Sequence, residues 1–264
     1  MRLAEQLYRT EAPTLTEIPK SHPRYESLLA RERIAQGVKD GITSTQGLIA
    51  QGRGEAFDYL IGERTTPSAK AATDVAAAVL LFAKRPALSV NGNVAALVPE
   101  GMVELSKVLN ATLEVNLFHR SEERVGKIAS LLRRLGAEKV LGEDPDETIP
   151  GLDHARAKAT RGAIFDADVV LIPLEDGDRC EALVRMGKKV IAIDLNPLSR
   201  TSRMATVTIV DNIVRAVPNL ISFAKDLSAT TPRDLQSIFH GYDNKVILRQ
   251  CVDEIQSHLT KQFQ

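Results

Sequence analysis

Short apolar runs rich in β-branched residues recur along the middle and end of the chain, and stretches with helical periodicity separate most of them. The six runs predicted as strands are Ala87–Val90, Thr112–Phe118, Lys139–Leu141, Asp168–Ile172, Val190–Ile193 and Val207–Val210. The intervening helices are predicted at Lys70–Lys84, Ser121–Leu135 and Asp178–Met186. Strands that alternate with helices favour a mostly parallel sheet with right-handed crossovers and helices on both faces. The pattern therefore predicts an α/β, Rossmann-like fold.

Further amphipathic helices are predicted on either side of this series. They are Tyr25–Lys39, Ile213–Leu227 and Lys245–Leu259. The segment Gly142–Arg161 is rich in Asp, Pro, Gly and Lys and is predicted as a loop. We expect residues 1–68 to form an N-terminal helical extension that folds back onto a Rossmann-like domain, residues 69–264, to give one compact unit.

The composition is that of an ordinary folded protein. Of the 264 residues 44% are hydrophobic and 26% are charged, and the formal net charge is zero, so any anion site must be local. Cys180 and Cys251 lack metal-binding spacing, and we expect free thiols in a reducing compartment. No run approaches the roughly 20 apolar residues that span a bilayer, and Glu5 and Glu11 interrupt any signal-peptide core. These features predict a cytoplasmic protein that binds neither nucleic acid nor a membrane.

Polar residues follow most of the predicted strands. They are Asn91-Gly92-Asn93, Asn116, Glu175-Asp176-Gly177-Asp178-Arg179, Asp194-Leu195-Asn196 and Asp211-Asn212. Because the carboxyl ends of parallel strands share one edge of the sheet, we expect these groups to converge on one crevice. Each residue alone is also a common turn or helix-cap residue, so the binding-site prediction rests on the group.

The loop between the last two predicted strands carries the clearest candidate chemistry. Both strands end in an acid, Asp194 and Asp211, and the loop contains Arg200, Arg203 and several hydroxyl side chains. Arginine donates forked hydrogen bonds to phosphate, so this loop suits an anionic, sugar-bearing ligand such as a nucleotide. The sequence has no GxxxxGK[ST] motif, no strand followed by GxGxxG and no Cys/His cluster. Their absence disfavours a P-loop fold, a standard dinucleotide dehydrogenase and a protein-ligated zinc.

Basic residues also occur in the N-terminal third. Arg31 lies on the first predicted helix, after the motif Lys20-Ser21-His22-Pro23-Arg24, and Arg53 lies between Gly52 and Gly54. The glycines allow close approach of the backbone to a ligand. A charged helix face and a tight turn are the alternative interpretation.

Five ordered motifs resemble one family, the archaeal phosphopantothenate synthetases or 4-phosphopantoate–β-alanine ligases. They are IPKSHPRYESLLARERI (18–34), GLIAQGRGEAFDYLIGE (47–63), SVNGNVAALVPE (89–100), EVNLFHR (114–120) and the long stretch from LIPLEDGDRC to IVRAVPNL (171–220). The resemblance covers most of the chain. The chain differs at Gln51, where some members of this family have histidine, and we therefore give that position no proton-transfer role.

The resemblance implies a step of archaeal coenzyme A biosynthesis. Such enzymes are Rossmann-like homodimers that require Mg²⁺ and condense 4-phosphopantoate with β-alanine, converting ATP to AMP and pyrophosphate. Carried over residue by residue, the implied ATP contacts are Arg31, Arg53, Asp194, Leu195, Asn196, Arg200, Thr201, Asn212 and Ile213. The extension would thus supply arginines to the ATP site, and Arg53 and Arg200 are predicted to be catalytic.

The remaining strand-end residues complete the expected site. Asn91, Asn93 and Asn116 are predicted substrate contacts. Asp176 and Asp178, with Glu175, are predicted to hold Mg²⁺ together with phosphate oxygens, although Asp178 could instead cap the following helix. Release of AMP implies an acyl-adenylate, which needs cations on the phosphates and exclusion of water.

Other classes of function remain open on the residues alone. They are another ATP-dependent acid–amine ligase that acts through an acyl-phosphate, a non-catalytic nucleotide-binding regulator and an NAD-linked oxidoreductase. The last is disfavoured by the missing glycine motif and by the arginines of the predicted pocket.

Overall fold

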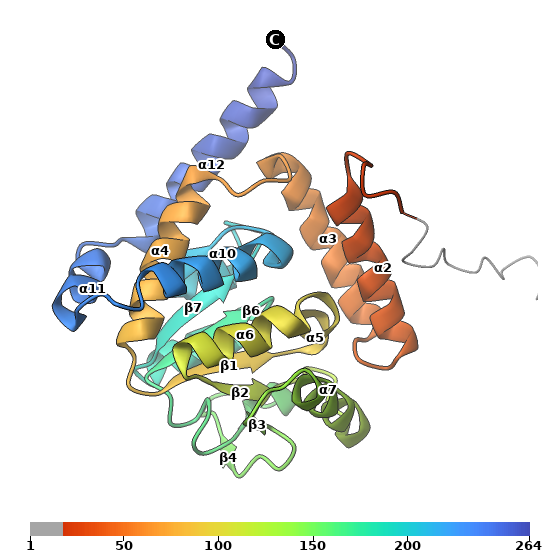
Figure 1. Cartoon of the computed structure of the whole chain (residues 1–264), viewed down its shortest axis with the longest axis vertical. Coiled ribbons are helices and arrows are strands. Elements are labelled where there is room, and N and C mark those ends of the chain that lie inside the picture. The colour runs from red at the N-terminus through yellow and green to blue at the C-terminus, as the bar shows by residue number, and fades with distance from the viewer. Residues whose placement is uncertain (1–17) are drawn as a thin grey trace, which may run out of the picture.

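The computed structural model describes residues 18–264 and is built on a six-stranded parallel sheet (Figure 1). The strands are β1 (Pro86–Val90), β2 (Thr112–Val115), β3 (Val140–Leu141), β6 (Val169–Pro173), β7 (Lys189–Ile193) and β8 (Val207–Ile209). Their order is β3-β2-β1-β6-β7-β8. The direction of the connections reverses between β1 and β6, which is the place where open α/β sheets bind ligands. The predicted α/β, Rossmann-like fold is confirmed.

Helices cover both faces of the sheet. They are α2 (Tyr25–Lys39), α3 (Thr45–Ile61), α4 (Pro67–Phe82), α5 (Gly92–Leu97), α6 (Pro99–Leu109), α7 (Glu122–Arg134), α8 (Gly177–Arg185), α9 (Arg200–Met204), α10 (Ile213–Asp226), α11 (Pro232–Phe239) and α12 (Asn244–Lys261). Alternate strand residues enter different cores, as the twofold period of a strand requires. Leu88 and Val90 pack with α4, α6, α7 and α10, whereas Ala87 packs with α8 and the segment 149–167.

Local sequence signals explain where the predicted helices begin and end. Thr66 caps α4 through the N–H of Ala69, with Pro67 at the first helical position. Ser121 caps α7, which has acidic residues in its first turn and basic residues in its last turn. Gly136 follows this helix at φ +91°, a conformation that glycine adopts without a steric penalty.

Three sequence predictions need correction. Gly52-Arg53-Gly54 forms no turn, because it lies inside α3, a helix that the periodicity did not predict. The predicted loop Gly142–Arg161 contains a short antiparallel pair, β4 (Glu147–Thr148) with β5 (Lys158–Ala159), and the 3-10 helix η2 (Ala155–Ala157). Asp178 does not cap α8, since Asp176 occupies the cap position and its side chain makes no capping hydrogen bond.

The N-terminal helices lie beside the carboxyl edge of the sheet (Figure 1). α2 packs on α3 and α5, and α3 also contacts α5 and α12. Residues 1–17 of the predicted extension lie outside the described residues, and the division at residue 68 stays a prediction. In residues 18–264 no helix is long and apolar enough to cross a membrane.

Candidate active site

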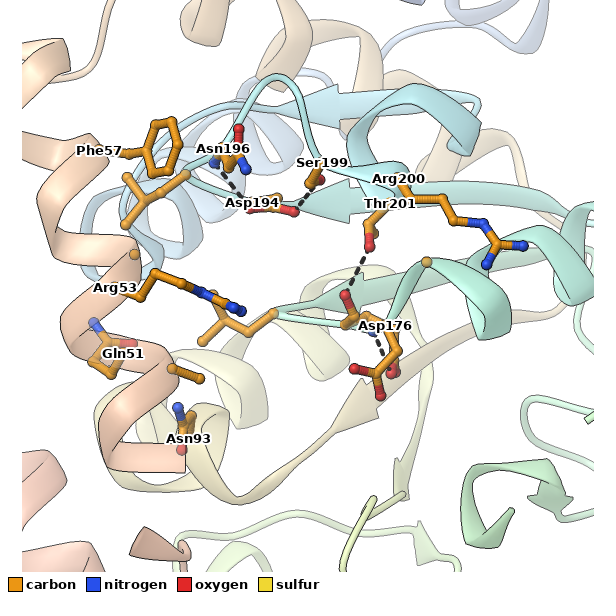
Figure 2. A pocket seen from close by; sticks show the side chains of 16 residues that line it. Gln51, Arg53, Phe57, Asn93, Asp176, Asp194, Asn196, Ser199, Arg200 and Thr201 are labelled. Atoms are coloured by element: carbon orange, nitrogen blue, oxygen red, sulfur yellow. Dashed lines mark hydrogen bonds between the residues drawn. The ribbon is translucent and has the colours of Figure 1, made fainter. Parts of the chain in front are cut away.

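A cavity of about 440 Å³ lies between α3 and the loops that follow β6 and β7 (Figure 2). Its polar lining residues are Gln51, Arg53, Asn93, Glu175, Asp176, Asp194, Asn196, Ser199, Arg200 and Thr201. Residues more than a hundred positions apart in the sequence thus meet at the sheet edge. The predicted convergence of strand-end groups is confirmed for the loops after β1, β6 and β7.

Asp194 organises the loop that follows β7. Its two carboxylate oxygens accept hydrogen bonds from the N–H of Asn196 (2.9 Å) and from the hydroxyl of Ser199 (2.5 Å). Ser199 in turn caps the short helix α9 through the N–H of Ser202. Burial raises the pKa of Asp194, because desolvation disfavours the charged form. The carboxylate therefore shapes the wall of the cavity as well as facing it.

Arg53 enters the cavity from the opposite wall. Its side chain extends from α3 into the space between Asp194 and Asp176 (Figure 2). Within residues 18–264 it belongs to no salt bridge, although its charge favours ionisation of Asp194. At Gly54 an added Cβ would lie 3.6 Å from the side chain of Leu195, an ordinary van der Waals distance, so α3 and the β7 loop are neighbours there. Leu195 is buried and joins a small apolar cluster there.

Arg200 and Thr201 occupy the start of α9 but serve different partners. The guanidinium of Arg200 binds Glu181 and points away from the cavity centre (Figure 2). Its aliphatic stem crosses Gly177, where an added Cβ would lie only 2.6 Å from the Cβ of Arg200. Thr201 donates a hydrogen bond to the carbonyl of Glu175 (2.8 Å) and so joins the loops after β6 and β7.

A second cavity of about 240 Å³ adjoins the first and shares Ala50, Asn93, Leu174 and Asp176 with it. Its cationic lining groups are Arg124 and Arg156, and His119 lies beside them. The two cavities are therefore adjacent and meet at these shared residues, and the arginines of the second cavity make it the more basic of the two. Sequence reasoning missed Arg124 and Arg156, because neither follows a strand directly.

The three predicted substrate asparagines are largely occupied by the protein. Asn91 accepts from the N–H groups of Asn93 and Val94, and its amide donates to the carbonyls of Pro173 and Leu174, both at 3.0 Å. Asn93 lines both cavities and donates to the carbonyl of Gly47 (2.9 Å).

Asn116 lies outside both cavity linings. It is buried, and its amide donates to the carbonyl of Lys158 (2.8 Å). Its predicted contact with substrate is therefore the least supported of the three by position.

The acidic residues after β6 are less available for a metal ion than the sequence suggested. Glu175 is buried between Arg156 and Arg179. Asp178 pairs with His154 (2.8 Å) outside the cavity. Burial opposes the ionisation of Asp178, but the hydrogen bonds from His154 and from the N–H of Arg179 outweigh that effect and lower the pKa of Asp178. Only Asp176 presents a carboxylate to both cavities, and residues 18–264 contain no cluster of three metal-ligating side chains.

Three predicted nucleotide contacts lie outside the cavity lining. Arg31 binds Glu55 (3.1 Å) and the hydroxyl of Tyr59 (3.2 Å). Asn212 accepts from the N–H of Val214 at the start of α10 and donates to Asp58 (2.8 Å). Ile213 is buried in the main core. Their predicted roles would need a movement of α2 or contacts through backbone groups.

Leu174 is a lining residue that no sequence signal indicated. It lies at the junction of the two cavities with φ +52°, a left-handed conformation that is uncommon for residues other than glycine. The amide of Asn91, through the two carbonyl bonds described above, holds this turn. The strained turn directs Glu175 inward and leaves Asp176 at the cavity junction.

The fold and the adjoining cavities define a Rossmann-like α/β protein. Its candidate ligand site contains arginine side chains and lies where the direction of the strand connections reverses, between β1 and β6. Comparison with known proteins narrows this class, because the family model for phosphopantothenate/pantothenate synthetase matches residues 68–258. The chain belongs to that family, as the sequence motifs indicated.

Curated relatives from archaea agree with this assignment. The chain is 56% identical over 245 residues to a protein of Methanosarcina mazei, covering 93% of this chain and 96% of that protein. It is 54% identical over 248 residues to a protein of Thermococcus kodakarensis, covering 94% and 95%. A protein of Methanospirillum hungatei is 52% identical over 224 residues, covering 85% and 91%. All three relatives are named 4-phosphopantoate–β-alanine ligase.

Proposed function

We propose that the chain is an ATP-dependent ligase that condenses 4-phosphopantoate with β-alanine to phosphopantothenate in coenzyme A biosynthesis. The observation that carries this proposal is the pair of joined cavities at the carboxyl edge of the sheet. One has the size and lining for a nucleotide, and the other has two arginines suited to a second anion. The names and identities of the archaeal relatives support the same activity.

In this proposal the larger cavity holds ATP. Asp194 and Asn196 would face the adenosine, as acids at strand ends bind ribose in related folds, and Leu195 would support them by packing. Arg53 would neutralise the phosphates, since it reaches the cavity centre. Arg200 would join it after leaving Glu181, with Thr201 fixing the loop.

The smaller cavity would hold 4-phosphopantoate. Arg124 and Arg156 supply positive charge for its phosphate, and Asn93 lies at the junction where the carboxylate would approach ATP. Like-charged substrates repel one another, so cations on both sides of the junction are required to bring them together.

The chemistry proceeds in two balanced steps. A carboxylate oxygen of 4-phosphopantoate attacks the α-phosphorus of ATP, and the bond from that phosphorus to the bridging oxygen breaks to release pyrophosphate. The amine of β-alanine then attacks the acyl carbon, the carbon–oxygen bond to AMP breaks, and the nitrogen loses a proton to solvent. Alignment and charge neutralisation are what the side chains contribute.

The proposed Mg²⁺ fits a single carboxylate. Mg²⁺ commonly uses one or two protein carboxylates together with substrate phosphates, and Asp176 is the acid placed at the cavity junction. The ion would offset phosphate charge there. Asp178 would need to leave His154 in order to contribute.

We also propose a homodimer that works in the cytoplasm. α10 uses its apolar face in the core, whereas α12 leaves Val246, Val252 and Leu259 partly exposed, which makes α12 the better contact surface of the two predicted helices. Cys180 and Cys251 are free and buried, as a reducing compartment allows. Light scattering on the purified protein measures the oligomeric state.

Omission of single components tests the main proposal. The protein is mixed with ATP, Mg²⁺, 4-phosphopantoate and β-alanine, and each is left out in turn. We expect phosphopantothenate, AMP and pyrophosphate only from the complete mixture. Release of ADP and phosphate would indicate an acyl-phosphate ligase, and ATP binding without product would indicate a nucleotide-binding regulator.

A further inference from the structure

A buried charge network lies beneath the junction of the two cavities. It consists of Arg156, Glu175, Asp176 and Arg179. The side chains of Glu175 and Arg179 are 0% exposed and that of Arg156 is 6% exposed, whereas that of Asp176 is 42% exposed. The network therefore connects the protein interior to Asp176, which among residues 18–264 is the one acid that faces both cavities.

Glu175 is the centre of this network. Its Oε1 accepts from the N–H of Asp176 (3.0 Å) and lies 3.0 Å from Nη1 of Arg156. Its Oε2 accepts from Nη1 of Arg179, which also donates to the hydroxyl of Ser89 on β1 (3.1 Å). One carboxylate thus joins β1, the turn after β6 and the segment that carries Arg156.

Arg156 extends the network into the smaller cavity. Its Nε lies 3.2 Å from Oδ2 of Asp176, and its Nη1 donates to the carbonyl of Asn116 (3.2 Å). His154 precedes it and accepts from the N–H of Arg156 through Nδ1, so the ring donates from Nε2 to Asp178. The guanidinium is held from several sides, with Glu175 as its only fully buried anion among residues 18–264.

This arrangement is a poor source of stability. Apolar side chains of similar volume often replace a buried ion pair with no loss of stability. Two nitrogens of Arg179, Nε and Nη2, also have no hydrogen-bond partner among the described residues, and buried polar groups without partners are costly. Because stability does not explain the presence of this buried charge network, we attribute the network to the fixed geometry that it gives the cavity junction.

We propose that Glu175 is a positioning residue, which holds Arg156 and the Asp176 backbone so that the smaller cavity binds its anionic substrate in register with ATP. This role of Glu175 rests on the proposed function for the identity of the anion, 4-phosphopantoate. Although Glu175 is one of the residues that line the larger cavity, its side chain is 0% exposed, so in this role the carboxylate acts through Arg156 and Asp176 and not by direct contact with a substrate.

Kinetics of Glu175→Gln test the proposal, because glutamine keeps the shape and removes the charge. We expect KM for 4-phosphopantoate to rise on the order of tenfold or more, as misplacement of a binding group does, with KM for ATP changed by less than about threefold. Glu254→Gln is the matched control, since Glu254 accepts two hydrogen bonds from Ser68 and neither residue lines a cavity, and neither KM should change. Equal changes in both KM values of Glu175→Gln, or no change, would overturn the inference.

A second variant separates positioning from folding. Glu175→Gln combined with Arg179→Met removes both charges of the fully buried pair and restores charge balance. Positioning predicts that the fold recovers while KM for 4-phosphopantoate stays high. Recovery of normal KM, or failure of both variants to fold, would assign Glu175 a structural role only.

A crystal structure of Glu175→Gln tests the positioning role without a measurement of enzyme activity. We expect the guanidinium of Arg156 to leave its 3.2 Å contact with Asp176. An unmoved Arg156 contradicts the positioning role even if the wild-type protein makes no phosphopantothenate. That absence of product would instead contradict the proposed function.

Discussion

Two regions build the candidate site in different ways. The floor, residues 174–178 and 194–201, consists of side chains that already bind one another, such as Asp194 with Ser199 and Thr201 with Glu175. The cover, helices α2 and α3, brings Arg53 over that floor and leaves its guanidinium directed into the cavity (Figure 2). The side chains of the floor are therefore held in place by one another, whereas the cover contributes a guanidinium that belongs to no salt bridge among residues 18–264.

The two regions also differ in how they are attached. The floor continues directly from the strands of the sheet. The cover contacts the helices around the sheet, through the carbonyl of Gly47 with Asn93 on α5 and through Asp58 with Arg215 on α10, and it adds a few apolar side chains such as Ile34 and Ile61 to the cores. Activity should therefore be most sensitive to the charge on the cover, and stability to the groups beneath the floor.

Replacement of Arg53 should have the largest effect. Arg53→Ala removes the cation that reaches the cavity centre, so we expect kcat to fall by about a hundredfold or more with the unfolding transition unchanged. Lys39→Ala, an exposed cation on the same cover, is the control and should remain active. Steady-state kinetics and urea unfolding measure both. Near-normal turnover of Arg53→Ala would remove the cover from the mechanism.

Replacement of Arg200 tests whether the floor must rearrange. Its guanidinium now binds Glu181, so a role at the phosphates requires that pair to open. We expect Arg200→Ala to lower kcat by roughly tenfold to a hundredfold. Arg185→Ala is the comparison, because it removes the other partner of Glu181 and should leave kcat nearly unchanged. Equal kcat values for the two variants would mean that Arg200 serves only its surface ion pair.

The floor and helix α2 of the cover were predictable from sequence, whereas helix α3 was not, and the reasons are physical. An apolar strand that stops at a polar residue marks the sheet edge, and Asp194 and Asp176 were found in this way. α3 was missed because Gly47, Gly52 and Gly54 lower helix propensity, and because two of its three buried residues, Gln51 and Asp58, are polar. Helix formation there depends on tertiary packing.

The sequence also did not give the roles of two individual residues, Arg156 and Asn91. Arg156 lies in the short 3-10 helix η2, inside a stretch whose sequence predicts only a loop, so only the folded chain brings it to the cavity. Asn91 has the side chain of a ligand contact, yet its amide and carbonyl are used to join β1 to the turn after β6. The residue type and its place at a strand end therefore predict where a polar side chain lies. Its hydrogen-bond partners in the folded protein decide whether it binds a ligand or holds the structure.

Loosening the attachment of the cover should have an intermediate effect. Asp58→Asn removes the charge that Arg215 and Asn212 bind, although Asp211 still pairs with Arg215. We expect a loss of about 1–3 kcal/mol in the free energy of unfolding and a several-fold rise in KM for ATP, because Arg53 lies on the same helix. Glu143→Gln breaks an exposed pair with Arg133 and should cost below about 1 kcal/mol. An unchanged KM for Asp58→Asn would show that α3 is held by its other contacts.

The smallest effect on activity is expected beneath the floor, at Glu114 on β2. Burial raises its pKa from 4.5 to about 7, against the opposing effects of the Ile164 N–H, Arg179 and the Thr160 N–H. Between these two values the folded state holds more protons than the unfolded state, so stability falls as pH rises through the window from 4.5 to 7. Glu114→Gln keeps the acceptor for the N–H of Ile164 (3.0 Å) and removes the charge. We therefore expect it to unfold like the wild type at pH 4, to be more stable by about 1–3 kcal/mol at pH 8, and to keep its kcat. Urea unfolding across this pH range measures the difference, and parallel stability curves for the two proteins would contradict it.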